Sequence, residues 1–294
     1  GSDLPMVDGV ALMRQVFDDA TRAARNPGIS GLSTGLPSLD DRIDGLQPAS
    51  MIVVAAPPSM GKTTFAMAMV QHAMRHTKYP VVVFSMEMPA LDIGRRMVSS
   101  ESRVHYAAIK RGSMTDEQAS IMATAASRLQ TKNLIVCDAS GLTPARMRGV
   151  LRRVVREHGG VSMAVVDYIQ LMDANKALSN NRNLELTGIS RDIKRMAMDF
   201  NMPFIAISQL TKDVEKAKRK PTNGDLRESG AIAQDADLIM MVHRQEKYDD
   251  EPNQENMGKA EILITKNRNG ACGSMLVGYD GPTFRFHELG PESW

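Results

Sequence analysis

The chain has 294 residues and a mass of 32.2 kDa, with 43% apolar and 24% charged residues, which excludes a disulfide-stapled miniprotein and a chain disordered along most of its length. Lys and Arg total 36 against 34 Asp and Glu, so net charge indicates no partner and any nucleic-acid surface must be local. The two cysteines lack the spacing of a zinc site, no apolar run is long enough to span a membrane, and no signal peptide is visible. We therefore expect a cytoplasmic protein with no membrane partner.

The N-terminal segment combines a short scar, an amphipathic helix and a joint. Gly1-Ser2 has the form of a pair left by protease cleavage. Apolar residues then recur at three- and four-residue spacing from Asp8 to about Arg25, which predicts an amphipathic helix ending at Asn26-Pro27-Gly28. Because such a helix has little of its own domain nearby, we favour docking on a neighbouring subunit over packing on the chain's own core. The expected divisions are residues 1–2 (scar), 3–28 (linker helix and joint) and 29–294 (globular domain).

From about residue 50 the sequence alternates buried strands with helices. Continuous short apolar runs are typical of strands covered on both faces, and their alternation with helices predicts an α/β fold with a mostly parallel twisted sheet. The expected strands are Met51–Ala56, Val81–Phe84, Leu134–Cys137, Met163–Val166, Phe204–Ile207 and Leu238–Val242. The expected helices are Lys62–His76, Leu91–Ser100, Pro144–His158 and Leu184–Phe200.

A candidate phosphate-binding loop lies between the first strand and the first helix. The segment Pro57–Thr63 reads Pro-Pro-Ser-Met-Gly-Lys-Thr and fits the pattern G-x-x-x-x-G-K-[ST], with Ala56 in place of the first glycine. Backbone N–H groups at such a junction face an anion. We predict an ATP site in which Lys62 reaches the β- and γ-phosphates and the Thr63 hydroxyl is a ligand of Mg²⁺. The residues expected to contact nucleotide are Ser59, Met60, Gly61, Lys62, Thr63 and Thr64.

Three polar residues end other predicted strands at the same edge of the sheet. Asp167 follows Met163–Val166 and is the expected carboxylate ligand of Mg²⁺. Glu87 follows the second strand and is the predicted general base on the attacking water. Gln209 follows the fifth strand and is expected to contact the γ-phosphate. An acid at a strand end also commonly caps the next helix, so a structural role is the alternative for these residues.

The C-terminal part changes pattern. The segments Ala260–Thr265 and Met275–Tyr279 flank Asn269-Gly270, a turn signal that predicts a β-hairpin. Lys266 and Arg268 are two positions apart beside that turn, so both side chains share one face. They suit insertion into a neighbouring subunit's site as an arginine finger and its partner. A solvated basic hairpin tip is the alternative.

The densest basic segment lies between residues 212 and 220, in an expected loop after the fifth strand. It carries five cations and two acids. Without interleaved aromatic residues it predicts contact with nucleic-acid phosphates rather than bases. A solvated charged face is the alternative. The expected contacts are Lys212, Lys216, Lys218, Arg219 and Lys220.

Together these residues resemble the ATPase domain of DnaB-type replicative DNA helicases, which has a RecA-like P-loop fold. The family's phosphate loop similarly reads A-x-P-S-M-G-K-T, so Ala56 fits the resemblance. The likeness covers about Ile29 to the end of the chain. The other similar blocks are Phe84–Pro89, Val166–Met172, Ser208–Leu210, Asp225–Gly230, Gln234–Ile239 and Lys266–Gly270.

The resemblance implies a homo-hexameric ring with ATP and Mg²⁺ between subunits, hydrolysis of ATP, and unwinding of duplex by translocation on single-stranded DNA. It implies that Lys266 and Arg268 complete the neighbour's site, and that Arg227, Glu228 and Gly230 contact the DNA backbone. A helicase loader and primase are the further partners, although the family's N-terminal helical domain has no counterpart in this sequence. Two alternatives stay open: a RecA-like recombinase or repair ATPase, and a nucleotide-gated assembly or loading module without motor activity.

Overall fold

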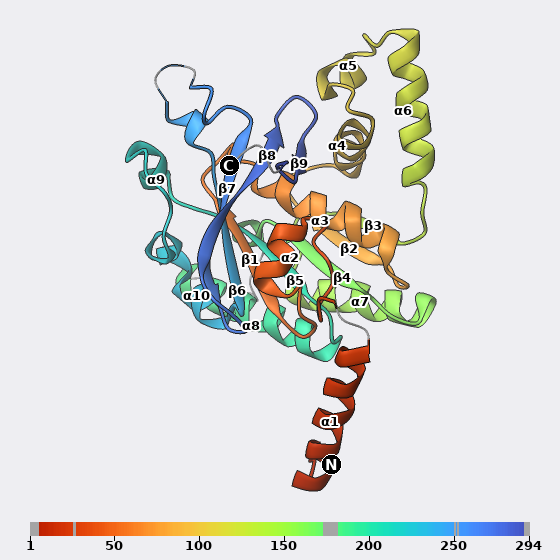
Figure 1. Cartoon of the computed structure of the whole chain (residues 1–294), viewed down its shortest axis with the longest axis vertical. Coiled ribbons are helices and arrows are strands. Elements are labelled where there is room, and N and C mark those ends of the chain that lie inside the picture. The colour runs from red at the N-terminus through yellow and green to blue at the C-terminus, as the bar shows by residue number, and fades with distance from the viewer. Residues whose placement is uncertain (1–5, 26–27, 173–181, 250, 252, 291–294) are drawn as a thin grey trace.

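The computed structural model describes residues 6–25, 28–172, 182–249, 251 and 253–290, without the side chains of residues 19, 22, 23, 182, 212 and 227–229 (Figure 1). The described residues form a nine-stranded sheet in the order β3-β2-β4-β5-β1-β6-β7-β8-β9. The parallel strands are β1 (Met51–Ala56), β2 (Val81–Ser85), β3 (Leu134–Asp138), β4 (Met163–Asp167), β5 (Phe204–Gln209) and β6 (Leu238–His243). The predicted α/β fold and its six parallel strands are confirmed.

Alternate residues of each parallel strand pack into two separate cores, which explains the continuous apolar runs. In β1, Ile52 and Val54 belong to one core, and Met51 and Val53 to the other. Burial on both faces is what a parallel sheet covered by helices requires. The helices over the first face are α2 (Pro37–Ile43), α3 (Lys62–His76) and α4 (Ala90–Ser102), and those over the second are α7 (Pro144–His158) and α8 (Arg182–Asp199) (Figure 1).

The register brings the ends of four strands together at one edge of the sheet. Ala56 at the end of β1 lies beside Gln209 at the end of β5, and Ser85 at the end of β2 lies beside Asp167 at the end of β4. We call this the C-terminal edge; it is the upper edge in Figure 1. Ligands of open α/β sheets bind outside the carboxyl ends of the strands, so the register places the candidate site here.

The predicted C-terminal hairpin is confirmed. It consists of β7 (Lys259–Asn267) and β8 (Gly273–Asp280), followed by β9 (Arg285–His287). The last pair is Ile264 with Gly273, so the connection is longer than the two-residue turn that Asn269-Gly270 signals. Because β7 is antiparallel to β6, with Lys266 beside Ile239 near the start of β6, the end of β7 lies at the N-terminal edge of the sheet.

Several elements were not predicted. They are α5 (Tyr106–Arg111), α6 (Asp116–Leu129), α9 (Lys212–Lys216), α10 (Gly230–Asp235), α2 and β9. A signal existed for α6, because Thr115 and Gln118 form a capping box at its start. The expected loop after β5 is wrong in part, since its first basic residues form α9. Charge density and helix formation are compatible, because Lys is a good helix former.

The predicted N-terminal helix is confirmed as α1 (Gly9–Arg25), which projects from the sheet domain in Figure 1. It begins one residue later than expected, because Asp8 precedes it and accepts a hydrogen bond from the Ala11 N–H at 2.8 Å. Val10, Met13 and Phe17 are 75%, 60% and 71% exposed, so the apolar face does not pack on the chain's own core. Docking of this face on a neighbouring subunit stays a prediction. Among the described residues no helix has the length and apolarity needed to cross a membrane.

Candidate functional site

The phosphate loop turns tightly before α3. Gly61 immediately precedes the helix with φ of 98°, and Ser59 has φ of 60°. A side chain at position 61 would enter a disfavoured backbone region, and its Cβ would lie 3.3 Å from the ring of Phe286. Ala56, at the position where the usual pattern has glycine, is a fully buried residue of β1. The glycine that this loop requires is therefore the one directly before Lys62.

A cleft of about 440 Å³ opens over the loop at the C-terminal edge. Ser59, Gly61, Lys62, Thr63 and Thr64 line it, and their contact with nucleotide stays a prediction. The Met60 side chain is instead buried in the hydrophobic core, so only its backbone can face a ligand. The remaining lining residues are Glu87, Met88, Arg96, Arg244, Lys247, Tyr279, Gly281 and Phe284.

Lys62 places a buried cation at the cleft. Its residue is 7% exposed, and its Nζ lies 5.4 Å from the ring centroid of Tyr168. None of the ion pairs among the described residues involves Lys62. An aromatic face stabilises a cation less than a carboxylate does. The Lys62 ammonium thus lies against an aromatic ring, with no ion pair among the described residues to compete with an anionic ligand.

Asp167 is a buried carboxylate whose hydrogen bonding is incomplete. It is 2% exposed, and burial raises its pKa to about 6, although Thr63 and the charge of Lys62 act in the opposite direction. Its Oδ1 atom has no hydrogen-bond partner among the described residues. Buried polar atoms without a partner are rare and costly. The Asp167 carboxylate and the Thr63 hydroxyl are the oxygen donors that Mg²⁺ prefers, so this pair fits the expected metal.

Glu87 lies beside Asp167. The Met86 N–H donates to the Asp167 carbonyl at 2.9 Å, which ties the ends of β2 and β4 together. Glu87 is exposed in the cleft, and its charge contributes to the raised pKa values of Asp167 and Tyr168. An exposed carboxylate at the rim of an anion site can contact a water molecule there. The structure thus brings Lys62, Thr63 and Glu87 to one cleft, with the buried Asp167 carboxylate hydrogen-bonded to Thr63.

Gln209 lies at the neighbouring strand end but does not line the cleft. Its backbone is fixed by Gln170, whose Nε2 donates to the Gln209 carbonyl at 3.1 Å and to Ser208 Oγ at 2.9 Å. The Gln209 N–H donates in turn to Gln170 Oε1 at 3.2 Å. Gln170, which holds this strand end in position, was not predicted from the sequence.

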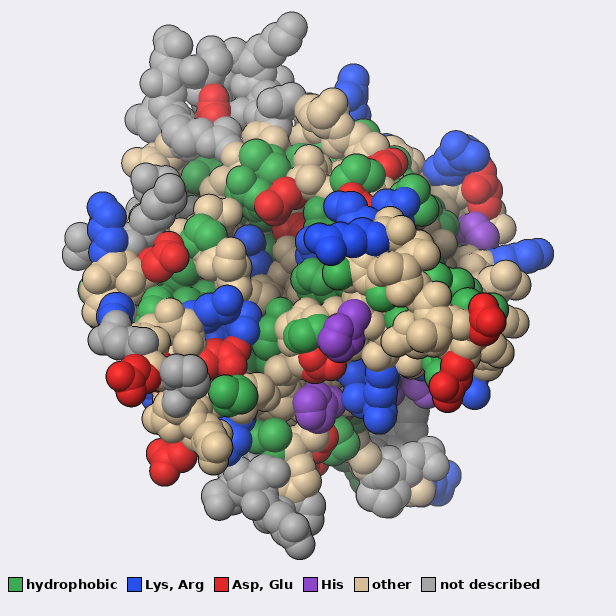
Figure 2. Space-filling view, turned by 90° about the horizontal axis from the view of Figure 1, so that it is seen from above, with side chains coloured by type: hydrophobic (Ala, Val, Ile, Leu, Met, Phe, Trp, Pro, Cys, Tyr) green, Lys and Arg blue, Asp and Glu red, His purple; other side chains and the backbone are tan. Residues whose placement is uncertain are grey.

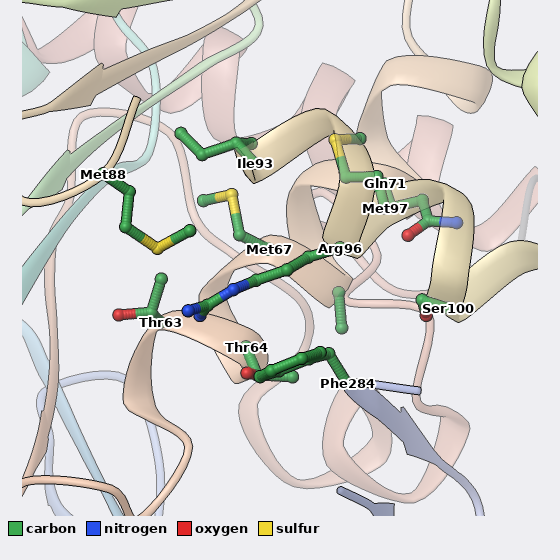
Figure 3. Close-up of a pocket in the computed structure, with 11 residues that line it drawn as sticks. Thr63, Thr64, Met67, Gln71, Met88, Ile93, Arg96, Met97, Ser100 and Phe284 are labelled. Atoms are coloured by element: carbon green, nitrogen blue, oxygen red, sulfur yellow. The ribbon is translucent and has the colours of Figure 1, made fainter. Parts of the chain in front are cut away.

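Arg96 is a further cleft residue that was not predicted from the sequence. It comes from α4, and its guanidinium carbon lies 4.4 Å from the ring centroid of Phe284. In Figure 3 the side chain runs between Met67 and Phe284 toward Thr63. Its Nε has no hydrogen-bond partner among the described residues, and its charge lowers the pKa of Asp167. No local pattern distinguishes Arg96 from Arg95, so only the packing of α4 on α3 identifies it.

Arg244 forms another wall of the cleft. It follows β6, its Nη1 donates to the Ser59 carbonyl at 3.3 Å, and its guanidinium carbon lies 4.0 Å from the ring centroid of Tyr279. Its Nε donates to Glu246 Oε1 at 3.0 Å. Asp167 was identified because it directly follows a predicted strand; Arg244 stands two residues after the predicted strand Leu238–Val242, so that signal is weaker for it.

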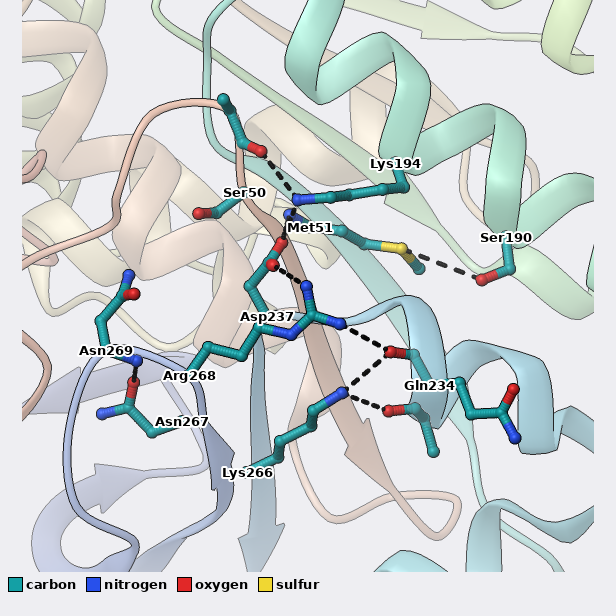
Figure 4. A network of polar contacts seen from close by, with 12 residues as sticks. Ser50, Met51, Ser190, Lys194, Gln234, Asp237, Lys266, Asn267, Arg268 and Asn269 are labelled. Carbon is teal, nitrogen blue, oxygen red and sulfur yellow. Dashed lines mark hydrogen bonds and ion pairs between the residues drawn. The ribbon is translucent and has the colours of Figure 1, made fainter. Parts of the chain in front are cut away.

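Lys266 and Arg268 lie at the opposite edge of the sheet from the phosphate loop, on the hairpin beside α10 (Figure 4). Lys266 Nζ donates to the carbonyls of Ala233 at 2.8 Å and Gln234 at 2.9 Å. Arg268 donates to Asp237 Oδ1 at 3.0 Å and to the Gln234 carbonyl at 3.2 Å. Both cations are therefore held by the end of α10, unlike a freely solvated hairpin tip. The single chain does not bring them to its own phosphate loop.

The basic segment 212–220 is only in part an open cationic surface. Arg219 makes two hydrogen bonds to Asp225, at 2.6 and 2.8 Å, and Lys220 pairs with Glu261 at 2.7 Å. Lys216 ends α9 and Gly230 begins α10. Seen from the C-terminal edge, basic side chains form separate groups (Figure 2). The side chains of Lys212, Arg227 and Glu228 lie outside what the structure describes, and the expected DNA contacts stay predictions, as does that of Lys218.

Comparison with known proteins identifies the same domain along nearly the whole chain. Residues 31–288 match the family model described as the DnaB-like helicase C terminal domain. The chain is 45% identical over 276 residues to the replicative DNA helicase DnaB of Haemophilus influenzae, covering 93% of this chain and 58% of that protein. It is 46% identical over 265 residues to the same helicase of Pasteurella multocida, covering 89% and 56%. The chain thus spans less than two thirds of these relatives.

Solved structures of related proteins have the same fold as this chain. The chain superposes on a solved ATPase domain with a TM-score of 0.88 and 28% identity, covering 97% of this chain and 100% of that chain. It superposes on a DnaB-like replicative helicase, described with its interactions with primase, with a TM-score of 0.89 and 28% identity, covering 97% and 69%. These similarities confirm the predicted RecA-like fold.

Proposed function

This chain belongs to the family of DnaB-like helicase C-terminal domains, and on that premise we propose that it is the ATP-hydrolysing motor domain of a replicative DNA helicase. The observation that carries the proposal is that Lys62, Thr63 and Glu87 line one cleft over a phosphate loop, with the buried Asp167 carboxylate hydrogen-bonded to Thr63. A cation, a hydroxyl, a buried carboxylate and an exposed carboxylate are the parts that phosphoryl transfer to water requires.

Each group has a separate part in hydrolysis. Backbone N–H groups of the loop and Lys62 hold the phosphates, and Thr63 and Asp167 would hold Mg²⁺. Bound Mg²⁺ would neutralise part of the phosphate charge. Glu87 accepts a proton from the attacking water as the water oxygen bonds to the γ-phosphorus, while the bond from that phosphorus to the β,γ-bridging oxygen breaks and ADP leaves with that oxygen. Arg96 is the cleft cation placed to stabilise the developing charge, since it points toward Thr63 (Figure 3).

The expected site is completed between subunits. One chain carries the cleft at the C-terminal edge of its sheet, whereas Lys266 and Arg268 lie at the N-terminal edge. A head-to-tail contact joins these two different surfaces, and repetition closes a ring when the rotation permits. We infer a ring of six in which Lys266 and Arg268 reach the neighbour's γ-phosphate. The exposed apolar face of α1 supports a second contact, with a neighbouring domain.

The proposed polymer is single-stranded DNA. The cations of the segment 212–220, with Arg227, Glu228 and Gly230, are the expected backbone contacts. The ion pairs of Arg219 and Lys220 would hold the conformation of this segment. They would still leave both cations available to DNA phosphates, because an arginine or lysine paired at the surface remains partly exposed. A helicase loader and primase are the proposed further partners.

The test combines assembly with hydrolysis. Light scattering after size exclusion, with a nonhydrolysable ATP analogue and an oligonucleotide, is expected to give a hexamer mass, and hydrolysis is expected to rise with single-stranded DNA. Filaments in electron microscopy would instead favour a recombinase, and DNA-stimulated hydrolysis without fork unwinding would favour an assembly module.

Mixing variants tests the composite site. Arg268→Ala should bind nucleotide but hydrolyse it slowly, and mixing with Lys62→Ala should restore activity at interfaces that combine an intact Lys62 with an intact Arg268. Arg152→Ala, an exposed arginine on α7, is the matched control and should match the wild type. Absence of rescue would show that Arg268 does not act on a neighbour.

A further inference from the structure

Asp237 is a buried carboxylate enclosed by donors from three parts of the chain (Figure 4). It is 8% exposed. Its Oδ2 accepts hydrogen bonds from Lys194 Nζ at 2.6 Å and from the Met51 N–H at 2.8 Å, and its Oδ1 accepts from Arg268 Nη1 at 3.0 Å. Both oxygens are thus occupied, and the side chain is held in one orientation.

The backbone fixes Asp237 as firmly as the side chains do. Its N–H donates to the Met51 carbonyl at 2.8 Å, and its carbonyl accepts from the Arg268 N–H at 2.9 Å. Lys194 is itself anchored, since its Nζ also donates to the Ala49 carbonyl at 3.0 Å. The carboxylate therefore links α8, the start of β1 and the hairpin.

These contacts orient Arg268 but leave some of its N–H donors without a hydrogen bond. One N–H goes to Asp237 and another to the Gln234 carbonyl at 3.2 Å. A guanidinium has five N–H donors, so three remain. The side chain is 52% exposed, which leaves its outer face accessible to an incoming anion.

We propose that Lys194 and Asp237 are positioning residues that fix the guanidinium of Arg268 in the orientation it needs to reach a neighbouring subunit's triphosphate. This role rests on the proposed function, because it matters only if Arg268 acts between subunits. Preorganising a flexible cation avoids ordering it during the reaction.

The charges around Asp237 indicate that it orients the Arg268 guanidinium without neutralising the positive charge of this region. Around the hairpin, Lys194, Lys266 and Arg268 face the carboxylates of Asp237 and Asp235, which leaves one positive charge in excess. Lys194 pairs with Asp237 at 2.6 Å, closer than Arg268 does at 3.0 Å. Lys194 thereby compensates the carboxylate, and Arg268 is aimed by Asp237 while it keeps an attractive charge for phosphate.

The first experiment measures ATP hydrolysis by the assembled chain. Asp237→Asn is expected to lower kcat roughly tenfold with little change in KM for ATP, since it disturbs a transition-state contact and leaves the phosphate loop intact. Asp199→Asn, which removes a carboxylate paired with Arg148, is the matched control and should behave as the wild type. Wild-type or faster hydrolysis by Asp237→Asn would overturn the inference, and faster hydrolysis would indicate that Asp237 restrains Arg268.

Combination with Arg268→Ala separates positioning from a general structural role. In that background Asp237→Asn should cause no further loss, because the residue it positions is gone. An equal further loss would mean that Asp237 acts elsewhere and would refute the inference. If Arg268→Ala itself hydrolyses ATP at the wild-type rate, the proposed function fails at this point, which is a distinguishable result.

Mixing and side-chain dynamics give independent readouts. Lys62→Ala should rescue Asp237→Asn, as it should Arg268→Ala, because the defect lies on the donating side of the interface; failure to rescue would place the defect elsewhere. In the unassembled chain, nitrogen relaxation of Arg268 Nε should report greater mobility in Asp237→Asn and in Lys194→Met, and Lys194→Arg should restore order. Unchanged mobility in both variants would overturn the inference without any need for assembly.

Discussion

The two edges of the sheet each bury an aspartate, and the two differ in what surrounds them. Asp167 at the C-terminal edge has an oxygen without a hydrogen-bond partner among the described residues, and burial raises its pKa to about 6. Asp237 at the N-terminal edge has both oxygens occupied by Lys194, Met51 and Arg268. Burial alone is therefore a poor guide to the role of an acid. Asp167, with an oxygen that lacks a hydrogen-bond partner, indicates a site suited to binding a cation. Asp237, with both oxygens hydrogen-bonded, indicates a structural role.

The largest expected effect is on ATP hydrolysis, from replacement of Lys62 at the C-terminal edge, and it is compared with replacement of Lys194 at the N-terminal edge. Lys62→Ala should reduce ATP hydrolysis by about a thousandfold or more, because a preorganised cation at the phosphates is lost. Lys194→Met should cost only about tenfold, because it acts through Arg268. Steady-state hydrolysis measures both, with Lys78→Ala as a control at an exposed lysine. Near-normal hydrolysis by Lys62→Ala would remove the basis for the ATP site.

Asp167→Asn should separate activity from stability. Hydrolysis is expected to fall by about a hundredfold, because a carboxylate suited to Mg²⁺ is removed. The nucleotide-free fold is expected to become more stable by roughly 3 kcal/mol at pH 8, because an ionised buried group is replaced by a neutral one. Urea unfolding of the two proteins measures the difference. Destabilisation by this substitution would contradict the inference that the ionised Asp167 carboxylate is unfavourable in the nucleotide-free fold.

The pH dependence of that difference has a defined sign. The pKa of Asp167 is near 3.8 when unfolded and about 6 in the folded chain, so the folded state binds the proton more tightly. Its contribution to stability is most favourable below about pH 4, declines as pH rises to about 6, and is constant above. Asp167→Asn should therefore match the wild type near pH 4 and exceed it at pH 8. An equal difference at both values would exclude this carboxylate as its source.

Asp237→Asn should change stability in the opposite direction. Replacing a carboxylate that accepts charge-assisted hydrogen bonds from two cations is expected to cost about 1 to 3 kcal/mol at pH 7. The same urea measurement applies, with Asp199→Asn as the control at an exposed ion pair. If both Asp167→Asn and Asp237→Asn stabilise the fold, the contrast between the edges is wrong.

The smallest expected effect belongs to Asp225, an occupied carboxylate near the surface. Hydrogen bonds from Arg219 hold its pKa at about 2. Because that pKa is below the unfolded value of 3.8, its contribution is present above about pH 4 and is lost as pH falls toward 2. Asp225→Asn should cost at most about 1 kcal/mol at pH 7, because its partner Arg219 is 45% exposed and solvent screens the pair. A cost at pH 2 equal to that at pH 7 would contradict this assignment.

Much of the fold was accessible from the sequence. The six buried strands and the helix after the phosphate loop follow from local periodicity, because a strand covered on both faces must be apolar at every position. Elements with few buried residues were missed. Helix α5 has no buried residue and α6 only Ala125, so hydrophobic periodicity gave little signal for either.

The candidate site was accessible only where its residues follow strands. Lys62, Thr63, Asp167 and Glu87 were found because the ends of parallel strands meet at one edge. Arg96 was not, since it reaches the cleft from the side of α4, and nothing in its neighbours along the chain shows that direction. The cleft walls formed by Tyr279 and Phe284 depend on how the C-terminal strands fold back over α3.

The sequence by itself determined which segments are strands and helices and which residues form the phosphate loop, because backbone preferences, burial patterns and glycine requirements act over a few neighbouring residues. Only the tertiary structure decided that Lys266 and Arg268 lie at the edge opposite to Lys62, and that Lys194 and Asp237 hold one of them. Strand order and the pairing of distant charges are set by the packing of the whole sheet. No local pattern contains that information.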